Sequence, residues 1–372
     1  MGRCVDKPTG AVPGGRVKAL VLAAGKGTRL KPLTNTVPKH LLPVGDKPLL
    51  FHVLDYIKGA GIKDIGVVVS PDSGPYIEEA LGTGRVWGGK LQFILQPEPL
   101  GLAHAVKVAQ GFLGDSPFLM LLGDNLIEGG VRDFLDEFQS SNPDAVIALK
   151  EVADPTAFGV AELDSSAKVV HLEEKPKKPR SNLAVVGVYL FTAVIHKAIT
   201  QIKPSWRGEL EITDAIQKLL EMGKEVKSHL VRGWWLDIGS NEALIEANRI
   251  VLDAFLKRDI KGNVDSQSRI IGRVHIGEGT TCENSVVRGP ALIGANCRIK
   301  SSTIRPFTNI MAGTVVEDSC LEHSLILENC QILRIGCLAD SVVGRNAALV
   351  AQGRSPRKIT AFLGDDDKVM VG

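Results

Sequence analysis

The sequence predicts an α/β domain with a Rossmann-like, mixed but mostly parallel sheet, followed by a left-handed parallel β-helix. Two observations support this prediction. From Val17 to about Leu252, short apolar runs rich in β-branched residues alternate with segments of helical period, which is typical of strands joined by helices in a parallel sheet. After residue 264, apolar residues recur about every sixth position and no amphipathic helix can be written, as expected for hexapeptide repeats.

In the first domain, four apolar runs are expected to be strands of one parallel sheet: VKALVL from Val17, IGVVVS from Ile65, LQFIL from Leu91 and FLMLLGD from Phe118. Between the first two runs, apolar residues at helical spacing predict a helix from Leu49 that stops at the glycines of GAG. The later runs AVIALKEV, VVHLEEK and LAVVGVYLF have less helix between them. They predict a second lobe over the carboxyl ends of the first sheet, where open α/β sheets bind ligands.

The second domain follows a helix-like segment and a polar, glycine-containing linker. Related tripeptides recur there at offsets of 17, 22 and 17 residues, close to three sixes, and begin at Ser285, Ser302, Ser324 and Ser341. This repeat predicts a solenoid with three short strands in each triangular coil, and with Gly and Asn at the corners because they tolerate left-handed backbone angles. The expected limits are a disordered leader at 1–16, the α/β domain at 17–252, the linker at 253–263, the β-helix at 264–350 and a tail at 351–372.

The composition excludes several classes of protein. The chain of 372 residues has 44% hydrophobic and 23% charged residues and a formal net charge of +2, so it has no broad basic face for nucleic acid, and any bound anion is expected to be small. The apolar run VKALVLAAG is too short for a signal peptide or a membrane span, which favours a cytoplasmic protein. The six cysteines form no CxxC pair, as expected for reduced thiols.

The stretch LAAGKGTRLKPLT, which begins at Leu22 where the first expected strand ends, is a glycine-rich, cationic turn. Gly25 and Gly27 leave no Cβ between backbone N–H groups and a phosphate. The spacing matches neither GxxxxGK[ST] nor the dinucleotide fingerprint, so a purely structural turn is the alternative. Arg29 and Lys39 lie on a loop that several prolines stiffen, and cations fixed in this way suit a polyphosphate.

Two acidic residues are candidate metal ligands. Asp124 ends the apolar run FLMLLGD, where strands of such sheets present catalytic groups, and Asp237 follows the aromatic run of GWWLDIGS. Carboxylates from two distant segments could hold Mg²⁺ while nucleotide phosphates and water complete its octahedron. The alternatives are a turn residue at Asp124 and, at Asp237, a cap for the helix that opens near Asn241.

The segment HLEEKPKKPRSN contains a further candidate site. Glu174 and Lys175 follow an alternating strand and precede Pro176, so a hydroxyl-binding acceptor and a cation stand side by side, as a sugar phosphate requires. No Ser-His-Asp or Cys-His arrangement is evident in the sequence. A sugar phosphate is already an anionic nucleophile, so its attack on a nucleotide phosphorus needs positioning and charge neutralisation rather than a protein nucleophile.

Eight ordered motifs between Val17 and Leu252 closely resemble those of the sugar-1-phosphate nucleotidyltransferases. They are LAAGKGTRLKPLT, PKHLLPV, QPEPLGLAHA, LGDN, FGV, EEKPKKPRSNLAVVGVY, RGELEITD and WLDIGS. Within that family the chain looks most like the long-form glucose-1-phosphate thymidylyltransferases, which add a left-handed β-helix to the catalytic domain. The resemblance implies a Mg²⁺-assisted, in-line attack of a hexose 1-phosphate on the α-phosphorus of a nucleoside triphosphate, with release of pyrophosphate.

The resemblance also implies roles for individual residues. The residues implied to hold the nucleotide are Leu22, Ala24, Gly25, Gly27, Thr28, Arg29, Gln96, Gly101 and Asp124. The residues implied to hold the sugar phosphate are Gly159, Glu174, Lys175 and Tyr189. The residues implied to be catalytic are Arg29, Lys39, Asp124 and Asp237. The two cations would neutralise charge on the phosphates, and the two aspartates would carry Mg²⁺.

The expected substrates are dTTP and glucose 1-phosphate, and the expected assembly is a homo-oligomer that binds neither nucleic acid nor membrane. Three alternatives stay open: a uridylyltransferase that uses UTP, a bifunctional enzyme whose β-helix acetylates amino-sugar phosphates, and a non-catalytic paralogue. For an acetyltransferase, His275 and His323 are the candidate residues of the β-helix. A paralogue without activity is disfavoured because all the charged candidate residues are present.

Overall fold

The computed structural model describes residues 16–353 and 358–371. The chain divides into two compact units. One unit comprises the residues up to Gly25 together with Leu50–Asp237, and the other comprises Lys26–Leu49 together with the residues from Ile238 onward. The second unit therefore combines the cationic loop after the first strand with the C-terminal solenoid, whereas the sequence predicts one division near Leu252. Residues 1–15 of the expected leader lie outside the described residues.

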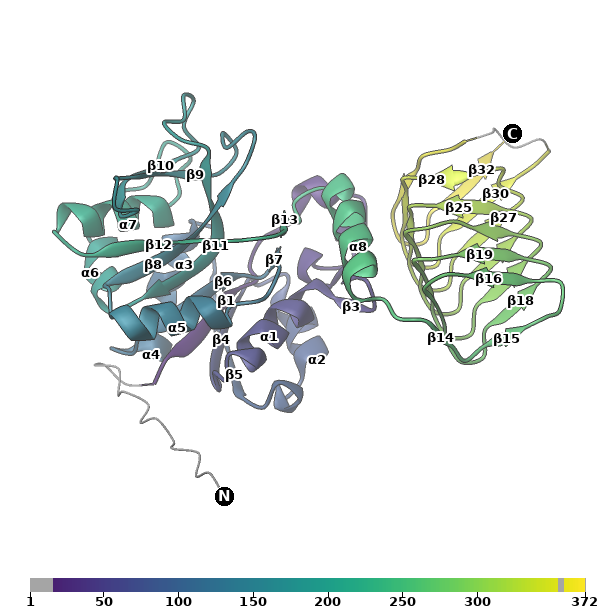
Figure 1. Ribbon diagram of the computed structural model, residues 1–372, viewed down its shortest axis with the longest axis horizontal. Coiled ribbons are helices and arrows are strands. Elements are labelled where there is room, and N and C mark those ends of the chain that lie inside the picture. The colour runs from purple at the N-terminus through teal and green to yellow at the C-terminus, as the bar shows by residue number, and fades with distance from the viewer. Residues whose placement is uncertain (1–15, 354–357, 372) are drawn as a thin grey trace, which may run out of the picture. The chain divides into compact units, whose positions relative to one another are not determined.

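In the part of the first unit that the structure describes, a nine-stranded mixed sheet forms the centre (Figure 1). Its strands are β1 (Lys18–Leu22), β4 (Asp64–Val69), β5 (Lys90–Leu95), β6 (Phe118–Leu122), β8 (Ala145–Glu151), β9 (Gly159–Leu163), β10 (Val169–Glu174), β11 (Leu183–Phe191) and β12 (Val226–Leu230). The order is β10-β9-β11-β6-β1-β4-β5, and β8 and β12 continue it beside β11. β1 pairs in parallel with β4 and β6, and β4 with β5, which confirms the predicted parallel sheet.

The prediction of a separate second lobe is wrong, because the later strands extend the same sheet. β11 is antiparallel to β6, with Leu190 opposite Leu119, and it also pairs with β8. The run Leu183–Phe191 is apolar along its whole length and almost fully buried. A strand of this kind is stable in the interior of a sheet that is covered on both faces, so it joins the first strands instead of starting a new layer.

Helices cover the sheet on both faces (Figure 1). They are α1 (Leu49–Gly59), α2 (Gly74–Leu81), α3 (Leu102–Val108), α4 (Gln110–Leu113), α5 (Arg132–Ser141), α6 (Val194–Ile199) and α7 (Ile212–Glu221), with a 3₁₀ turn at Arg85–Trp87. α1 begins at the predicted residue, and Gly61 beyond its end has a φ of +73°, as the predicted glycine stop requires. α3, α6 and α7 share one buried core with Phe118, Met120 and Phe191 of the sheet. Among the described residues, no helix is both long and apolar enough to cross a bilayer.

A short antiparallel ribbon is formed by β7 (Asn125–Ile127) and β13 (Trp235–Asp237). Its register places Asp237 opposite Asn125. Because Asn125 directly follows Asp124, pairing of the two strands brings both candidate metal ligands to one end of the ribbon.

The second unit contains a parallel β-helix, and its described strands lie in three sheets (Figure 1). The first sheet consists of β14 (Asp259–Ile260), β17 (Val274–Ile276), β20 (Ala291–Ile293), β23 (Thr308–Ile310), β26 (Leu325–Ile326), β29 (Val342–Val343) and β31 (Phe362–Leu363). The second consists of β15 (Asn263–Val264), β18 (Thr281–Glu283), β21 (Arg298–Lys300), β24 (Val315–Glu317), β27 (Gln331–Leu333), β30 (Ala348–Ala351) and β32 (Lys368–Val371). The third consists of β16 (Arg269–Ile271), β19 (Val286–Arg288), β22 (Thr303–Ile304), β25 (Cys320–Glu322) and β28 (Leu338–Ala339). Successive coils pair in parallel, which confirms the predicted left-handed β-helix.

The apolar residues of the hexapeptide repeat are buried inside the solenoid, and its serines link successive coils. The backbone N–H of Ser302 donates to Ser285 Oγ at 3.1 Å, and that of Ser341 donates to Ser324 Oγ at 3.2 Å. The predicted tripeptides therefore lie in two separate columns, each with a spacing of 17 residues. The irregular offset of 22 residues in the sequence is the step from one column to the other.

The solenoid extends beyond the predicted limits of 264–350 at both ends. β14 begins at Asp259, and β32 ends at Val371, in the segment expected to be a tail. In the last coil, Ile359, Leu363 and Val369 pack against the solenoid core. Ala361 and Val371 also pack there. The last coil pairs Val343 with Leu363 and Leu349 with Val369, so it follows the preceding coil at a spacing of 20 residues and departs from the spacing of 17 in the predicted repeat.

α8 (Asn241–Phe255) and the segment Lys26–Leu49 complete the second unit. The segment contains 3₁₀ turns at Thr28–Leu30, Leu33–Asn35 and Lys39–Leu41 and the strand pair β2 (Pro43–Val44) and β3 (Lys47–Pro48). In the strands of the first β-helix sheet, some residues alternate with the core-facing positions and do not belong to the solenoid core. Four of these residues are also buried: Leu292, Asn309, Leu325 and Val342. Hydrogen bonds from Asn309 to Gly45 and Asn248 show that the strand pair and α8 cover this face.

Candidate active site

The glycine-rich loop of the second unit is held closed by contacts between its own residues. Gly27 has a φ of +64°, and a Cβ on it would lie 2.9 Å from Lys39 Cβ. Thr34 Oγ1 donates to the Gly27 carbonyl at 2.8 Å. Glycine is therefore required at position 27 both for its backbone angle and for the close approach of Lys39. The loop brings Thr28 and Arg29, in its first 3₁₀ turn, into one compact segment with Lys39.

Arg29 lies against Gly239, which belongs to the WLDIGS motif. A Cβ on Gly239 would be 2.6 Å from Arg29 Nη2. The next residue, Ser240, caps α8, because its Oγ accepts the Ala243 N–H at 3.2 Å. Ser240 is thus the cap of this helix, and it fills the capping role that was the alternative for Asp237.

The two aspartates of the first unit meet at a shared hydrogen-bond donor. Asn125 Nδ2 lies 3.0 Å from Asp124 Oδ1 and 3.3 Å from Asp237 Oδ1. Trp235 Nε1 donates to Asn125 Oδ1 at 2.7 Å and fixes the orientation of the amide. Among the described residues, no cluster of three or more His, Cys, Asp or Glu side chains could hold a metal ion. Two adjacent carboxylates still fit a hard divalent cation whose other ligands are phosphate and water oxygens.

Gln96, the residue expected to bind the base, is buried next to Gly101 and His104. Its Nε2 lies 3.1 Å from the Gly101 carbonyl and 3.1 Å from His104 Nδ1. The carbonyl can only accept, so the group that faces it is the amide nitrogen. His104 Nδ1 then accepts the second N–H, which requires a neutral ring. Burial, followed by the charge of Lys107, lowers the pKa of His104 below its usual 6.5 and favours that form.

Gly101 makes a backbone contact that the sequence does not reveal. Its φ is +100°, and a Cβ would lie 2.4 Å from the Leu210 carbonyl oxygen. Leu210 N–H donates to the Leu100 carbonyl at 2.7 Å, and the Leu210 carbonyl accepts from Ala103 N–H at 3.0 Å. The segment that contains Gln96 and the segment that contains RGELEITD are therefore joined through Gly101.

The residues expected to bind the sugar meet around Glu174. Its Oε2 accepts from Thr213 Oγ1 at 3.0 Å. A Cβ on Gly159 would lie 2.5 Å from Thr213 Cγ2 and 3.2 Å from Glu174 Oε2, so the missing side chain leaves room for this pair. Burial and, next, the negative charge of Glu211 raise the pKa of Glu174, whereas Thr213 lowers it by hydrogen bonding and Lys175 and Arg207 lower it by their charges.

Arg207 is a charged residue of this site that the sequence reasoning missed. Its guanidinium forms an ion pair with Glu209 and lies 3.7 Å from Glu174 Oε1 and 3.6 Å from Glu211 Oε1. Ser205 Oγ donates to the same Glu211 oxygen at 2.8 Å. The sequence signal for Arg207 is its place at the start of the RGELEITD motif, which also contains Glu209 and Glu211.

The remaining predicted residues differ in exposure. Lys175 has a φ of +45°, and its Nζ lies 4.0 Å from Glu174 Oε1 with 41% of the side chain exposed, so it can meet a ligand. Tyr189 is only 3% exposed and stacks on Phe191, with ring centroids 5.7 Å apart. Burial and the charge of Glu174 raise the pKa of Tyr189, which therefore stays a neutral phenol. In this structure its ring belongs to the buried core of the first unit.

Leu22 ends β1 in the first unit, and Ala24 and Gly25 follow the strand. Leu22 is the last residue of the strand and is buried, and the Ala23 N–H between it and Ala24 donates to the Val68 carbonyl at 2.8 Å. The chain thus leaves the sheet beside β4 just before Gly25, at the carboxyl edge where parallel sheets bind ligands.

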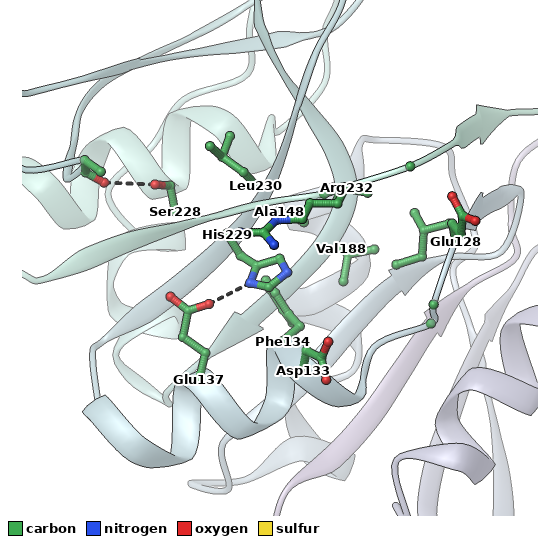
Figure 2. Close-up of a pocket in the computed structure, with 16 residues that line it drawn as sticks. Glu128, Asp133, Phe134, Glu137, Ala148, Val188, Ser228, His229, Leu230 and Arg232 are labelled. Carbon is green, nitrogen blue, oxygen red and sulfur yellow. Dashed lines mark hydrogen bonds and ion pairs between the residues drawn. The ribbon is translucent and has the colours of Figure 1, made fainter.

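A separate cavity of about 730 Å³ lies in the first unit and contains none of the predicted site residues. Figure 2 shows His229 of β12 directed toward Glu137 of α5. The distance between His229 Nδ1 and Glu137 Oε2 is 2.6 Å. Phe134 packs edge-on against His229 with ring centroids 5.5 Å apart. The segment after β12 lines the cavity, and Lys150 Nζ holds it by donating to the Gly233 carbonyl at 2.5 Å.

A mixed sheet whose first strands are parallel, a cationic glycine turn after β1 and two aspartates that share a hydrogen-bond donor together define a nucleotidyltransferase. The chain belongs to the nucleotidyl transferase family, whose model matches residues 18–254. It is 45% identical, over 95% of its length and 99% of the relative, to a glucose-1-phosphate thymidylyltransferase of Streptomyces griseus. It is 42% identical, over 89% of its length and 93% of the relative, to the low-salt glycan biosynthesis nucleotidyltransferase Agl11 of Haloferax volcanii.

A solved structure supports the same class. A glucose-1-phosphate thymidylyltransferase of Bacillus anthracis, crystallised with sucrose, superimposes with a TM-score of 0.61 at 35% identity. The match covers 65% of this chain and 98% of that chain.

Proposed function

We propose that this nucleotidyltransferase transfers a thymidylyl group from dTTP to glucose 1-phosphate and releases dTDP-glucose and pyrophosphate. The observation that carries the proposal is the contact of Gly101 with Leu210, which joins the hydrogen-bonded group of Gln96, Gly101 and His104 to an ionic cluster around Glu174. A nucleoside and a sugar would be bound by adjoining segments of one unit. The similarity to the Streptomyces thymidylyltransferase along almost the whole chain supports this choice of substrates.

In the proposed base site, Gln96 reads the pyrimidine edge through its Oε1. Both of its N–H groups are directed to Gly101 and His104, so the amide oxygen is the atom available to a ligand. An amide oxygen accepts the imide N–H that thymine and uracil share, and it does not pair with the ring nitrogen of cytosine. Gln96 therefore selects for this class of pyrimidine.

In the proposed sugar site, Glu174 accepts a hydroxyl of the hexose and Lys175 binds the phosphate. Arg207 and Thr213 hold the Glu174 carboxylate in place. Arg29 and Lys39 neutralise the triphosphate, and the charge on the departing pyrophosphate grows during the reaction.

Asp124 and Asp237 would hold the metal ion, for which we propose Mg²⁺. When bound, this ion neutralises phosphate charge and aligns the α-phosphate. An oxygen of the sugar phosphate forms the new bond to the α-phosphorus while the bond to pyrophosphate breaks. The chain supplies no nucleophile for this step and needs no strong base, because the attacking oxygen already carries negative charge.

The test is a substrate matrix. Pyrophosphate release is measured with dTTP, UTP, CTP and ATP against the 1-phosphates of glucose, galactose, mannose and N-acetylglucosamine, and products are identified by mass. We expect the highest kcat/KM with dTTP and glucose 1-phosphate and negligible turnover with CTP. A clear preference for UTP would replace the nucleotide assignment, and turnover of no pair would overturn the function. Acetyl-CoA with glucosamine 1-phosphate is included as a separate reaction and is expected to give no product.

A further inference from the structure

The last coil of the β-helix is hydrogen-bonded to the loop that carries Arg29 and Lys39. Thr36 Oγ1, in the middle of this loop, donates to Asp365 Oδ2 at 2.6 Å. The other oxygen of Asp365 accepts the Arg345 N–H at 2.6 Å. One carboxylate thus connects the loop to the backbone of the preceding coil, in which Arg345 follows β29.

A packing contact lies beside this hydrogen bond. A Cβ on Gly364 would come within 3.1 Å of Pro32 Cβ, so the loop packs closely on the glycine backbone. The Gly364 N–H donates to Asp367 Oδ2 at 2.7 Å, which fixes the turn that receives the proline. The contact with Pro32 therefore involves an ordered part of the solenoid.

The far end of the loop is held by a second, buried group of hydrogen bonds. Asn309, in β23 of the solenoid, is 0% exposed, and its Nδ2 donates to the Gly45 carbonyl at 2.7 Å and to Asn248 Oδ1 at 2.9 Å. Asn248, in α8, accepts the Gly45 N–H at 3.1 Å. Both peptide groups of Gly45 are thus bound to buried side chains. Removing either asparagine would leave the buried Gly45 peptide group that it binds without this partner, so the arrangement favours one position of the loop.

We propose that the β-helix positions the loop 26–49 for catalysis and that Asp365 and Asn309 are positioning residues. The two attachments flank Lys39 in the sequence, one at Pro32 and Thr36 and the other at Gly45. A cation that moves by about an ångström loses much of its effect on a transition state. The inference rests on the proposed function for the roles of Arg29 and Lys39, while the attachment itself can be tested without activity.

The first experiment compares variants of two aspartates in the full-length protein. Asp365→Ala removes the attachment, and Asp365→Asn keeps it, because an amide accepts from the Arg345 N–H and donates to Thr36. Asp265→Ala is the matched control, since Asp265 also accepts a backbone N–H of the solenoid, that of Asn284 at 3.0 Å. We expect kcat for pyrophosphate release to fall about tenfold in Asp365→Ala, with little change in Asp365→Asn and Asp265→Ala. The KM for glucose 1-phosphate should stay the same in all three variants.

Hydrogen exchange of the loop gives a second measurement that does not depend on turnover. Backbone amides in residues 26–49 should exchange faster in Asp365→Ala than in wild type, and Asp265→Ala should match wild type. If exchange in the loop is the same in both alanine variants, or if kcat falls equally in both, the positioning role is wrong. If the wild-type protein turns over no substrate pair while exchange still separates the variants, the proposed function fails and the attachment of the loop stands.

Discussion

Asn125 lies opposite Asp237 across the β7–β13 ribbon, with its Nδ2 3.3 Å from one Asp237 oxygen. The same nitrogen is 3.0 Å from Asp124, and Trp235 fixes the amide from its other side. One neutral donor thus orders two carboxylates that would otherwise repel each other. Carboxylates that are oriented in this way suit the proposed metal site.

Replacing the ordering amide should weaken metal binding. In Asn125→Leu the two carboxylates lose their shared donor, and we expect the Mg²⁺ concentration for half-maximal pyrophosphate release to rise by about tenfold or more. Trp235→Phe removes only the indole N–H, and its effect should have the same direction and a smaller size. Asp124→Asn should abolish turnover without loss of the fold. A Mg²⁺ dependence of Asn125→Leu equal to that of wild type would contradict the assignment of the two aspartates.

Gly239→Ala should reduce activity without reducing stability. The added Cβ would lie 2.6 Å from Arg29 Nη2. Because the end of an arginine side chain moves easily, the guanidinium shifts instead of the backbone, and the melting temperature should change little. We expect a fall in kcat of about tenfold. Gly59→Ala, where the new Cβ meets no atom within 4 Å, is the control and should keep wild-type kcat.

Gly101→Ala, in contrast, should cause a large loss of stability. At a φ of +100°, an alanine is strained, and its Cβ would lie 2.4 Å from the backbone oxygen of Leu210, which cannot move alone. We expect a loss of about 1–3 kcal/mol in the free energy of unfolding by urea. Gly111→Ala in α4, whose Cβ meets no atom within 4 Å, should be neutral or slightly stabilising. Equal stability of the two variants would show that the tight contact is absent.

The sequence predicts the sheet and the solenoid well because both follow from local periodicity. α1 begins at Leu49 as predicted, and the parallel pairing of β1 with β4 is the one expected. The sequence does not predict which of these segments pack together. The cationic loop follows β1 directly, yet Thr36 and Gly45 bind the solenoid through partners that lie hundreds of residues away in the chain. No periodic pattern encodes such contacts.

The same limit applies to the candidate site. Glu174 could be selected from the sequence because it stands next to a lysine at the end of an alternating strand. Arg207 could not, because its role depends on three acidic neighbours, and the one at Glu174 is brought close only by the pairing of distant segments. For Gly101, the resemblance implies a place among the nucleotide-binding residues, whereas its nearest neighbour in the structure is the backbone of Leu210.

Removing Arg207 should change how sugar binding depends on pH. Burial and Glu211 already raise the pKa of Glu174, and Arg207 is one of the groups that lower it. In Arg207→Gln this pKa rises further, so Glu174 becomes protonated at a higher pH as the solution is acidified. We expect the KM for glucose 1-phosphate to increase on acidification from a higher pH than in wild type. The pH profile of the KM for dTTP should be the same in Arg207→Gln as in wild type and is the internal control. Lys218→Gln, which removes an exposed ion pair with Glu221, should leave both profiles unchanged.

Acidification should also weaken nucleotide binding, through His104. The pKa of this ring is lowered from 6.5, first by burial and then by Lys107, so the ring is neutral at pH 7 and accepts the Gln96 N–H. As the pH falls through the lowered pKa, the imidazolium becomes a donor. The Gln96 amide must then turn its oxygen toward His104, which removes the acceptor for the base. We therefore expect the KM for dTTP to rise at a pH below 6.5.

Two variants test whether His104 is the group whose protonation raises the KM for dTTP. His104→Asn keeps an acceptor that does not titrate, so its KM for dTTP should lack the rise on acidification. Lys107→Gln removes a charge that lowers the pKa of His104, so the rise should begin at a higher pH than in wild type. Protonation of the substrates affects every enzyme equally and cancels in the ratio of variant to wild-type KM at each pH. A ratio for Lys107→Gln that stays constant across the acidic range would exclude His104 as the titrating group.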